Sequence, residues 1–156
     1  MEEKWMIEPG KGLGKIRFGI GRADLIGMLG EPDAVDKNEE EGVVCEHFYY
    51  EDMDASFTFS EDEGDRLLVI TVASPAYSIA GRLFVGLSRG EAALVFHALR
   101  WDEPIIDTLS EPGNASLVYT FEKFGLDIWF DDDILSGFQM SPGWLENGEI
   151  AWPENK

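Results

Sequence analysis

The chain has 156 residues, with 12 Lys and Arg against 31 Asp and Glu, so its formal net charge is −19. This excess of acids argues against binding to DNA, RNA or an anionic membrane, because phosphate groups attract clustered bases. An apolar fraction of 44% suffices for a packed core and excludes a disordered acidic tail. One cysteine excludes an internal disulfide, and residues 1–5 show no secretory signal pattern, so we expect a cytoplasmic protein.

The first predicted element is a short helix that starts near residue 21 and ends at Gly30. Leu25, Met28 and Leu29 have the i, i+3, i+4 spacing that is typical of a helix with one apolar face. We therefore expect these three side chains to be buried against the rest of the domain.

Three β-rich runs follow this helix, separated by short acidic segments that are typical of hairpin turns. The runs span residues 44–51, 54–60 and 66–73. Phe57 and Phe59 alternate with polar residues, which predicts strands with one face packed on the helix. We interpret the three glutamates at 39–41 as a solvated loop; in a second interpretation they steer a basic protein partner.

The same order of signals recurs about 70 residues later, which predicts an internal repeat. Residues 18–24 recur as 85–91, where Ser88 and Glu91 have the spacing of a capping box. Three more β-rich runs follow at 116–122, 125–130 and 133–140. We predict an α+β protein of two tandem repeats, each a short helical segment packed on an antiparallel β-meander. The repeats span 10–75 and 76–142, and a tail spans 143–156.

Several residues of the first copy resemble a known family. They are Gly19, Arg22, Asp24, 29–32, 48–50, 57–59 and 67–70. The pattern is similar to the small β-barrel-assembly lipoprotein (SmpA/OmlA-like) domain, whose duplicated form is found in β-lactamase inhibitor proteins. The resemblance implies a fold that binds proteins through a sheet and performs no chemistry. The sequence has neither a lipoprotein signal nor paired cysteines, so we do not expect membrane anchoring or periplasmic assembly work.

The sequence contains no strong signal for a cofactor, a metal or a catalytic residue. Residues 10–15 are rich in glycine but lack the spacing of a phosphate loop, and we interpret them as a flexible lead-in to the first strand. Cys45 and His47 share one strand face, but a zinc site needs three or four ligands. His97, the other histidine, is expected on a helix surface, and residues 131–133 are expected to form a tight turn.

The most informative predicted surface is the strand face turned away from the helices. The predicted partner-binding residues are His47, Tyr49, Thr58, Ile70, Asp127, Trp129 and Gln139. Tyrosine and tryptophan over a sheet, rimmed by acids, suit the anchors of a protein-binding surface. In the alternative interpretation the tail, through Trp144, Leu145 and Trp152, covers this face, or the two copies pack on each other.

These observations favour a non-enzymatic, acidic protein-binding module, monomeric or weakly dimeric. The first hypothesis is an intracellular inhibitor or immunity-type protein that blocks a basic enzyme or toxin through its sheet face. The alternative is a small-ligand-binding or enzymatic α+β protein that uses a cleft between the repeats. Its favoured residues are Asp127, Trp129, Tyr49 and His47. A third hypothesis is a structural subunit of a larger assembly.

Overall fold

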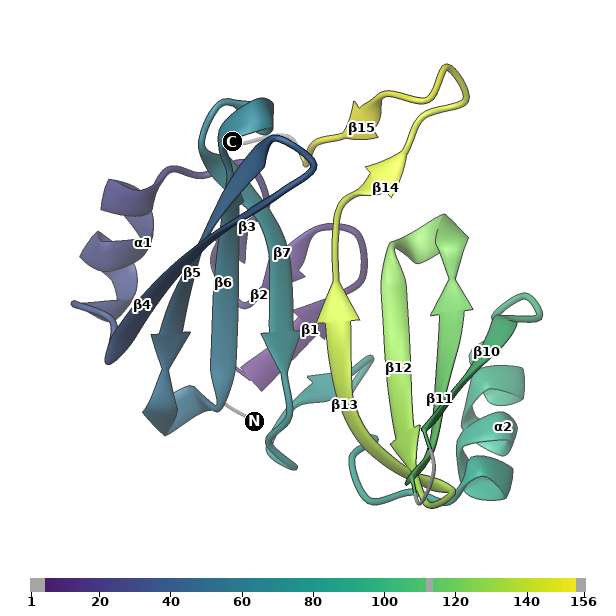
Figure 1. Cartoon of the computed structure of the whole chain (residues 1–156). Coiled ribbons are helices and arrows are strands. Elements are labelled where there is room, and N and C mark those ends of the chain that lie inside the picture. The colour runs from purple at the N-terminus through teal and green to yellow at the C-terminus, as the bar shows by residue number, and fades with distance from the viewer. Residues whose placement is uncertain (1–4, 112–113, 154–156) are drawn as a thin grey trace.

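The computed structural model describes residues 5–111 and 114–153 and is dominated by one antiparallel sheet of eight strands (Figure 1). Its first half consists of β4 (Ala34–Glu40), β5 (Val43–Tyr50), β6 (Ala55–Ser60) and β7 (Arg66–Val72). Its second half consists of β10 (Ile105–Glu111), β11 (Asn114–Phe121), β12 (Leu126–Asp131) and β13 (Ile134–Met140). The spatial order is β10-β11-β12-β13-β7-β6-β5-β4. The protein therefore belongs to the α+β class, as predicted.

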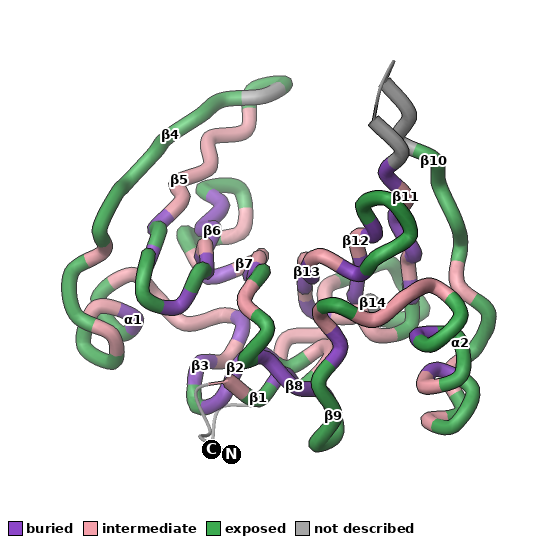
Figure 2. The backbone as a smooth tube through the Cα atoms, turned by 90° about the horizontal axis from the view of Figure 1, so that it is seen from below, coloured by how far each residue is buried: buried purple, intermediate pink, exposed green. Residues whose placement is uncertain are grey.

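Each half of the sheet is preceded in the chain by one helix. These are α1 (Arg22–Leu29) and α2 (Arg89–Ala98). Figure 2 shows that the sheet is curved from one edge strand, β4, to the other, β10. Both helices lie on the convex side of this curve. A second sheet has the order β3-β2-β1-β8-β9, and β14 and β15 form a small hairpin. Their bounds are β1 (Met6–Glu8), β2 (Gly12–Leu13), β3 (Ile16–Arg17), β8 (Ser78–Ile79), β9 (Arg82–Leu83), β14 (Gly143–Trp144) and β15 (Ile150–Ala151).

The helix side of the eight-stranded sheet forms one hydrophobic core shared by both halves. Phe57 and Phe59 point into this core, as the sequence predicts. The other aromatic and aliphatic side chains on this face of the same strands and their counterparts are also buried: Phe48, Tyr50, Tyr119, Phe121, Ile128 and Phe130. Alternation along each strand brings these residues to one face. Burial of each such side chain contributes about 1.5–3 kcal/mol to folding.

The two halves meet at a seam between β7 and β13, where three antiparallel register pairs join them. These pairs are Ile70 with Met140, Thr71 with Gln139, and Val72 with Phe138. At the start of β7 and of β13, where these two strands do not pair with each other, the chain segment before a helix pairs with the strand instead. Leu67 exchanges backbone hydrogen bonds with 19–20, and Leu135 exchanges them with 86–87. The order of one helix and four strands thus occurs twice in the chain, while the repeat itself and its boundaries stay predictions.

Three sequence-based expectations for local structure are wrong. Each half has a fourth strand, and the glutamates expected in a loop include Glu39 and Glu40 of β4. This strand lacks an apolar alternation because its residues with described side chains are exposed on both faces. The lead-in at 10–15 includes β2, and Met28 is 51% exposed because Leu25 is the buried residue of the short helix α1.

The expected outward orientation of Ile70 is also wrong, since Ile70 is completely buried in the core. The register between β6 and β7 shifts between Thr58 and Phe59, so one extra residue, Leu68, is inserted opposite them. Such a bulge reverses the face to which the following residues point. Val72, two residues further along β7, is buried for the same reason.

Candidate functional site

The face of the eight-stranded sheet opposite the core, termed the outer face, carries the predicted binding residues except Ile70. Its central row crosses all eight strands through register partners: Ala34, Tyr49, Ser56, Thr71, Gln139, Asp127, Thr120 and Ile105. The flanking rows are Asp36, His47, Thr58 and Val69 in the first half, and Gly137, Trp129, Val118 and Asp107 in the second. The positions on β4 and β10 were missed because these edge strands were not predicted.

Acidic side chains cross the outer face. Asp36 and Asp107 are exposed on the two edge strands, and Asp127 is half-buried between them. The rows defined above contain no lysine and no arginine. One base, Arg66, lies in the next row of the first half, through the register pairs of Cys45 with Ser60 and of Ser60 with Arg66, and its guanidinium stacks on Trp152. The negative potential of the named rows favours a positively charged ligand surface.

The arginines of the family-like motif lie on the helix side and have a structural role. The Nε of Arg22 donates to Glu46 Oε1 at 2.6 Å, and its Nη2 donates to Asp65 Oδ1 at 3.2 Å. The Nε of Arg89 donates to the hydroxyl of Tyr119 at 2.9 Å. Each arginine therefore ties the start of a helix to its own half of the sheet, on the side away from the outer face.

Two aromatic side chains stand on the outer face as possible anchors. Tyr49 is 39% exposed, and its hydroxyl donates to Asp54 Oδ1 at 3.5 Å. Partial desolvation, followed by the carboxylates of Asp54 and Glu51, raises the pKa of Tyr49 above its ordinary value. Its phenol thus keeps its proton at neutral pH and can donate to a ligand acceptor. Trp129 is half-buried in the second half of the sheet.

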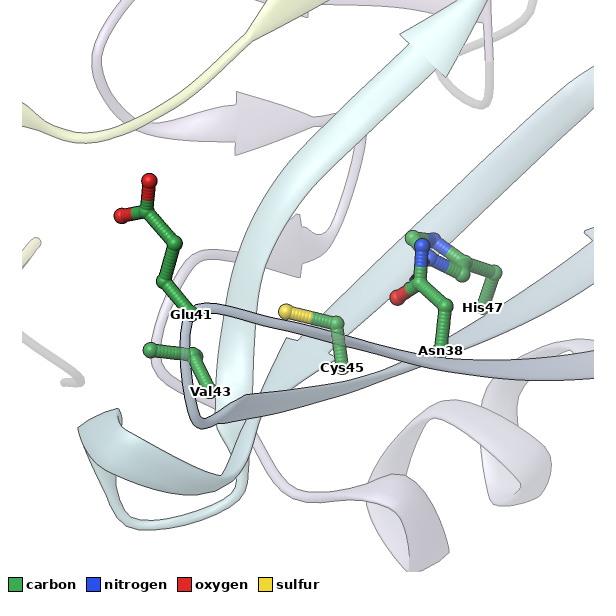
Figure 3. Close-up of a pocket in the computed structure, with 5 residues that line it drawn as sticks. All are labelled: Asn38, Glu41, Val43, Cys45 and His47. Atoms are coloured by element: carbon green, nitrogen blue, oxygen red, sulfur yellow. Dashed lines mark hydrogen bonds between the residues drawn. The ribbon is translucent and has the colours of Figure 1, made fainter.

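His47 is held in place on the outer face by two neighbours. Its Nδ1 lies 2.7 Å from the hydroxyl oxygen of Thr58, and its Nε2 lies 3.3 Å from Asn38 Oδ1. Thr58 is only 8% exposed, so it serves to orient the imidazole ring rather than to contact a large ligand itself. Cys45 lies two residues before His47 on the same strand face, as the sequence predicts (Figure 3).

Two open pockets adjoin the outer face, one in each half. The first has a volume of about 670 Å³ and is lined by Asn38, Glu41, Val43, Cys45 and His47 (Figure 3). The second has a volume of about 580 Å³ and is lined by Thr120, Glu122, Lys123, Gly125, Leu126, Asp127 and Ser141. Tyr49 and Asp127 lie four strands apart in the sheet, and neither of these two pockets is lined by both residues.

The described part of the tail leaves Tyr49 accessible. The ring of Trp152 stacks against the guanidinium of Arg66, whose Cζ lies 3.9 Å from the ring centroid, and it also lies against Gly19. Leu145 is 50% exposed. The side chain of Trp144 lies outside the described residues. The tail thus contacts the end of the sheet where β7 begins and does not cover the aromatic anchor in the first half.

The described residues contain neither a candidate metal cluster nor a membrane-spanning helix. In residues 5–111 and 114–153, no group of three or more His, Cys, Asp and Glu residues could hold a metal ion. No helix within the same ranges is long and apolar enough to cross a membrane. Asp132 and Asp133 lie in a turn with positive φ values of 50° and 66°, which agrees with the tight turn predicted at 131–133.

Comparison with known proteins gives structural neighbours but no family. No family model and no curated protein matches the chain, so the SmpA/OmlA-like resemblance stays a prediction. The chain is similar to an extracellular protein containing a SCP domain from Bacillus anthracis, with 14% identity and a TM-score of 0.46. It is also similar to a candidate β-lactamase inhibitor protein from Streptococcus mutans, with 9% identity and a TM-score of 0.33.

The two matches differ in coverage. The first covers 80% of this chain and 43% of the Bacillus protein, so the chain spans less than half the length of that neighbour. The second covers 81% of this chain and 84% of the Streptococcus protein.

Proposed function

We propose that this chain is a non-enzymatic protein-binding module that binds a basic protein through the outer face of its sheet. The observation that carries the proposal is the composition of this face. Its central and flanking rows combine two aromatic anchors, Tyr49 and Trp129, with Asp36, Asp107 and Asp127, and these rows contain no lysine or arginine. A contiguous surface with aromatic anchors and one sign of charge is typical of a protein interface.

The proposed roles of charge and aromatic area differ. The net charge of −19 steers a basic partner toward the chain and raises the association rate at low salt. Tyr49 and Trp129 then supply the buried area that slows dissociation. We further propose that the partner is a basic enzyme or toxin whose active cleft is blocked, and that the chain acts in the cytoplasm as a monomer or weak dimer.

Affinity capture from a lysate of the source organism tests the proposal. The baits are the wild-type chain and the Tyr49→Ala/Trp129→Ala double variant, and each recovered protein is purified and titrated by calorimetry. We expect a basic protein that binds the wild type with a sub-micromolar Kd. Binding to the double variant is expected to be at least about 30-fold weaker, because an aromatic hot spot contributes about 2 kcal/mol.

The matched control is the Met28→Ala/Leu94→Ala double variant, which removes exposed apolar side chains from the two helices on the other side of the sheet. It is expected to bind as the wild type does. Recovery of no protein with a sub-micromolar Kd contradicts the proposal. So does a partner that the outer-face variant binds as tightly as the wild type.

A further inference from the structure

The pocket at the β4–β5 hairpin has the chemistry of a site for one cationic side chain. Its five lining residues project from the same side of the hairpin (Figure 3). Val43 and Cys45 are half-buried and supply an apolar wall. Glu41 and Asn38 supply a carboxylate and an amide oxygen, and His47 closes the inner end toward the centre of the sheet. The arrangement suits a ligand with an apolar stem and a positively charged head.

The orientation of His47 leaves acceptor capacity in the pocket. Its two ring nitrogens lie within hydrogen-bonding distance of Thr58 Oγ1 and Asn38 Oδ1. An amide oxygen has two lone pairs, so Asn38 can accept a second hydrogen bond from a ligand cation. The carboxylate of Glu41 is exposed, and no hydrogen bond or ion pair within the described residues engages it.

The charge around the pocket also favours a cation. Residues 31–65 contain fourteen acids and only one base, Lys37. Lys37 is the register partner of Glu46, whose carboxylate pairs with Arg22 on the helix side, so Lys37 lies on the side of β4 away from the pocket. Arg66 lies two strands from Cys45 in the same row, where its guanidinium stacks on Trp152. The acids of residues 31–65 far outnumber these bases, so their field favours a cation in the pocket.

Two positions of the pocket differ between the halves. In the repeat register Ser116 and Val118 take the places of Cys45 and His47. The hydroxyl of Ser116 donates to Asp131 Oδ1 at 2.6 Å, and the hydrogen bonds from Ser116 and Ser136 lower the pKa of Asp131. The counterparts of Glu41 and Val43 lie outside the described side chains.

We propose that this pocket binds the side chain of a lysine or arginine residue of the protein partner. The inference rests on the proposed function and adds a specific subsite to it. The methylene stem packs along Val43 and Cys45, and the charged head lies between the Glu41 carboxylate and the Asn38 amide oxygen. The pocket fixes the register of the partner on the outer face, while Tyr49 and Trp129 supply the larger buried area.

A peptide titration tests the pocket apart from any partner. The probes are acetyl-Gly-Lys-Gly-amide, its arginine analogue and its norleucine analogue, added to the ¹⁵N-labelled full chain and followed by NMR. We expect saturable shifts at residues 43–47 with the lysine or arginine peptide and none with norleucine. Glu41→Gln is expected to weaken binding about two- to fivefold, as for an exposed ion pair. Glu103→Gln removes an equal charge from the exposed segment before β10, the opposite edge strand of the sheet, and is expected to leave binding unchanged.

Shifts spread over all acidic segments, or equal effects of the two glutamate variants, would overturn the pocket assignment. So would equal binding of the norleucine peptide, or no shift at residues 43–47. These outcomes leave the proposed function untouched, because it is decided by the Tyr49→Ala/Trp129→Ala capture. Failure of that capture, with the peptide still bound at the pocket, contradicts the proposed function instead.

Discussion

The two halves of the sheet share the same backbone arrangement and the same arginine contacts but carry different residues on the outer face. In both, an arginine at the first helical position reaches a residue on the second strand and an acid in the last hairpin. In both, the register between the third and fourth strands shifts by one residue. The outer face, by contrast, has His47 and Tyr49 in the first half where the second has Val118 and Thr120.

The two groups of features lie in different parts of the molecule. The shared features lie on the helix side or within the backbone, where they hold a helix to four strands. The features that differ include the residues of the outer face and the cap at the start of each helix. Substitutions on the helix side should therefore change the stability of the whole chain, and substitutions of the outer-face residues should change the proposed binding with little effect on stability.

The largest expected effect concerns the shared core. Phe59 and Phe130 occupy matching positions in the two halves and are completely buried. Phe59→Ala and Phe130→Ala should each lower the free energy of unfolding by about 3–5 kcal/mol. Because one core joins the halves, each variant should unfold in urea in a single transition, followed by far-UV circular dichroism and tryptophan fluorescence. Two separate transitions, with one half unchanged, would show that the halves are independent domains.

A smaller effect distinguishes the two arginines. Arg22→Met leaves the carboxylate of Glu46, which is only 22% exposed, without its partner. We expect a loss of about 1–3 kcal/mol, against about 1 kcal/mol or less for Arg89→Met, whose partner Asp133 is 73% exposed. Urea unfolding of both variants measures the difference. Equal losses would contradict the stronger role assigned to the first arginine.

The smallest effect concerns the helix N-termini. Ser88 accepts from the backbone of Glu91, whose side chain accepts in turn, whereas Gly21 offers α1 no side-chain cap. Ser88→Ala should lower the free energy of unfolding by about 1 kcal/mol, and Gly21→Ser should raise it by a few tenths. Thermal unfolding checks both, and a destabilising Gly21→Ser would contradict the comparison.

The same capping box predicts a pH dependence. Hydrogen bonds from the backbone and side chain of Ser88 lower the pKa of Glu91 below 4.5. A carboxyl group with a lowered pKa stabilises the folded state when the pH is above the ordinary pKa of that group. This contribution disappears as the pH falls through the lowered pKa. Thermal unfolding of Glu91→Gln between pH 6 and pH 3 should therefore converge on that of the wild type at the acidic end.

The sequence predicted the elements that have a buried face. The alternation of Phe57 and Phe59 located β6, and Gly30, with a φ of 84°, ends α1 as expected. It failed for β4 and β10, because edge strands with exposed residues on both faces carry no periodic signal. It also failed for Ile70, because a one-residue bulge reverses the face without any mark in the composition.

The candidate site was predicted in outline from the same alternation. His47, Tyr49, Thr58, Asp127, Trp129 and Gln139 all lie on the outer face. The sequence did not predict how far apart these residues lie across the sheet. That spacing depends on the seam between β7 and β13, which pairs strands far apart in the sequence. Nothing in a single sequence indicates which two distant strands will pair.

The seam has a consequence for how the chain is made. It is the only place in the eight-stranded sheet where neighbouring strands are not consecutive in the chain, and it joins Val72 to Phe138, 66 positions later. At a synthesis rate of about 5–20 residues per second, β7 emerges from the ribosome roughly 3–13 s before its partner is complete. During that interval β7 presents an unpaired edge to other nascent chains. We expect this long loop to close late in folding, because strand pairs between distant parts of a chain form slowly.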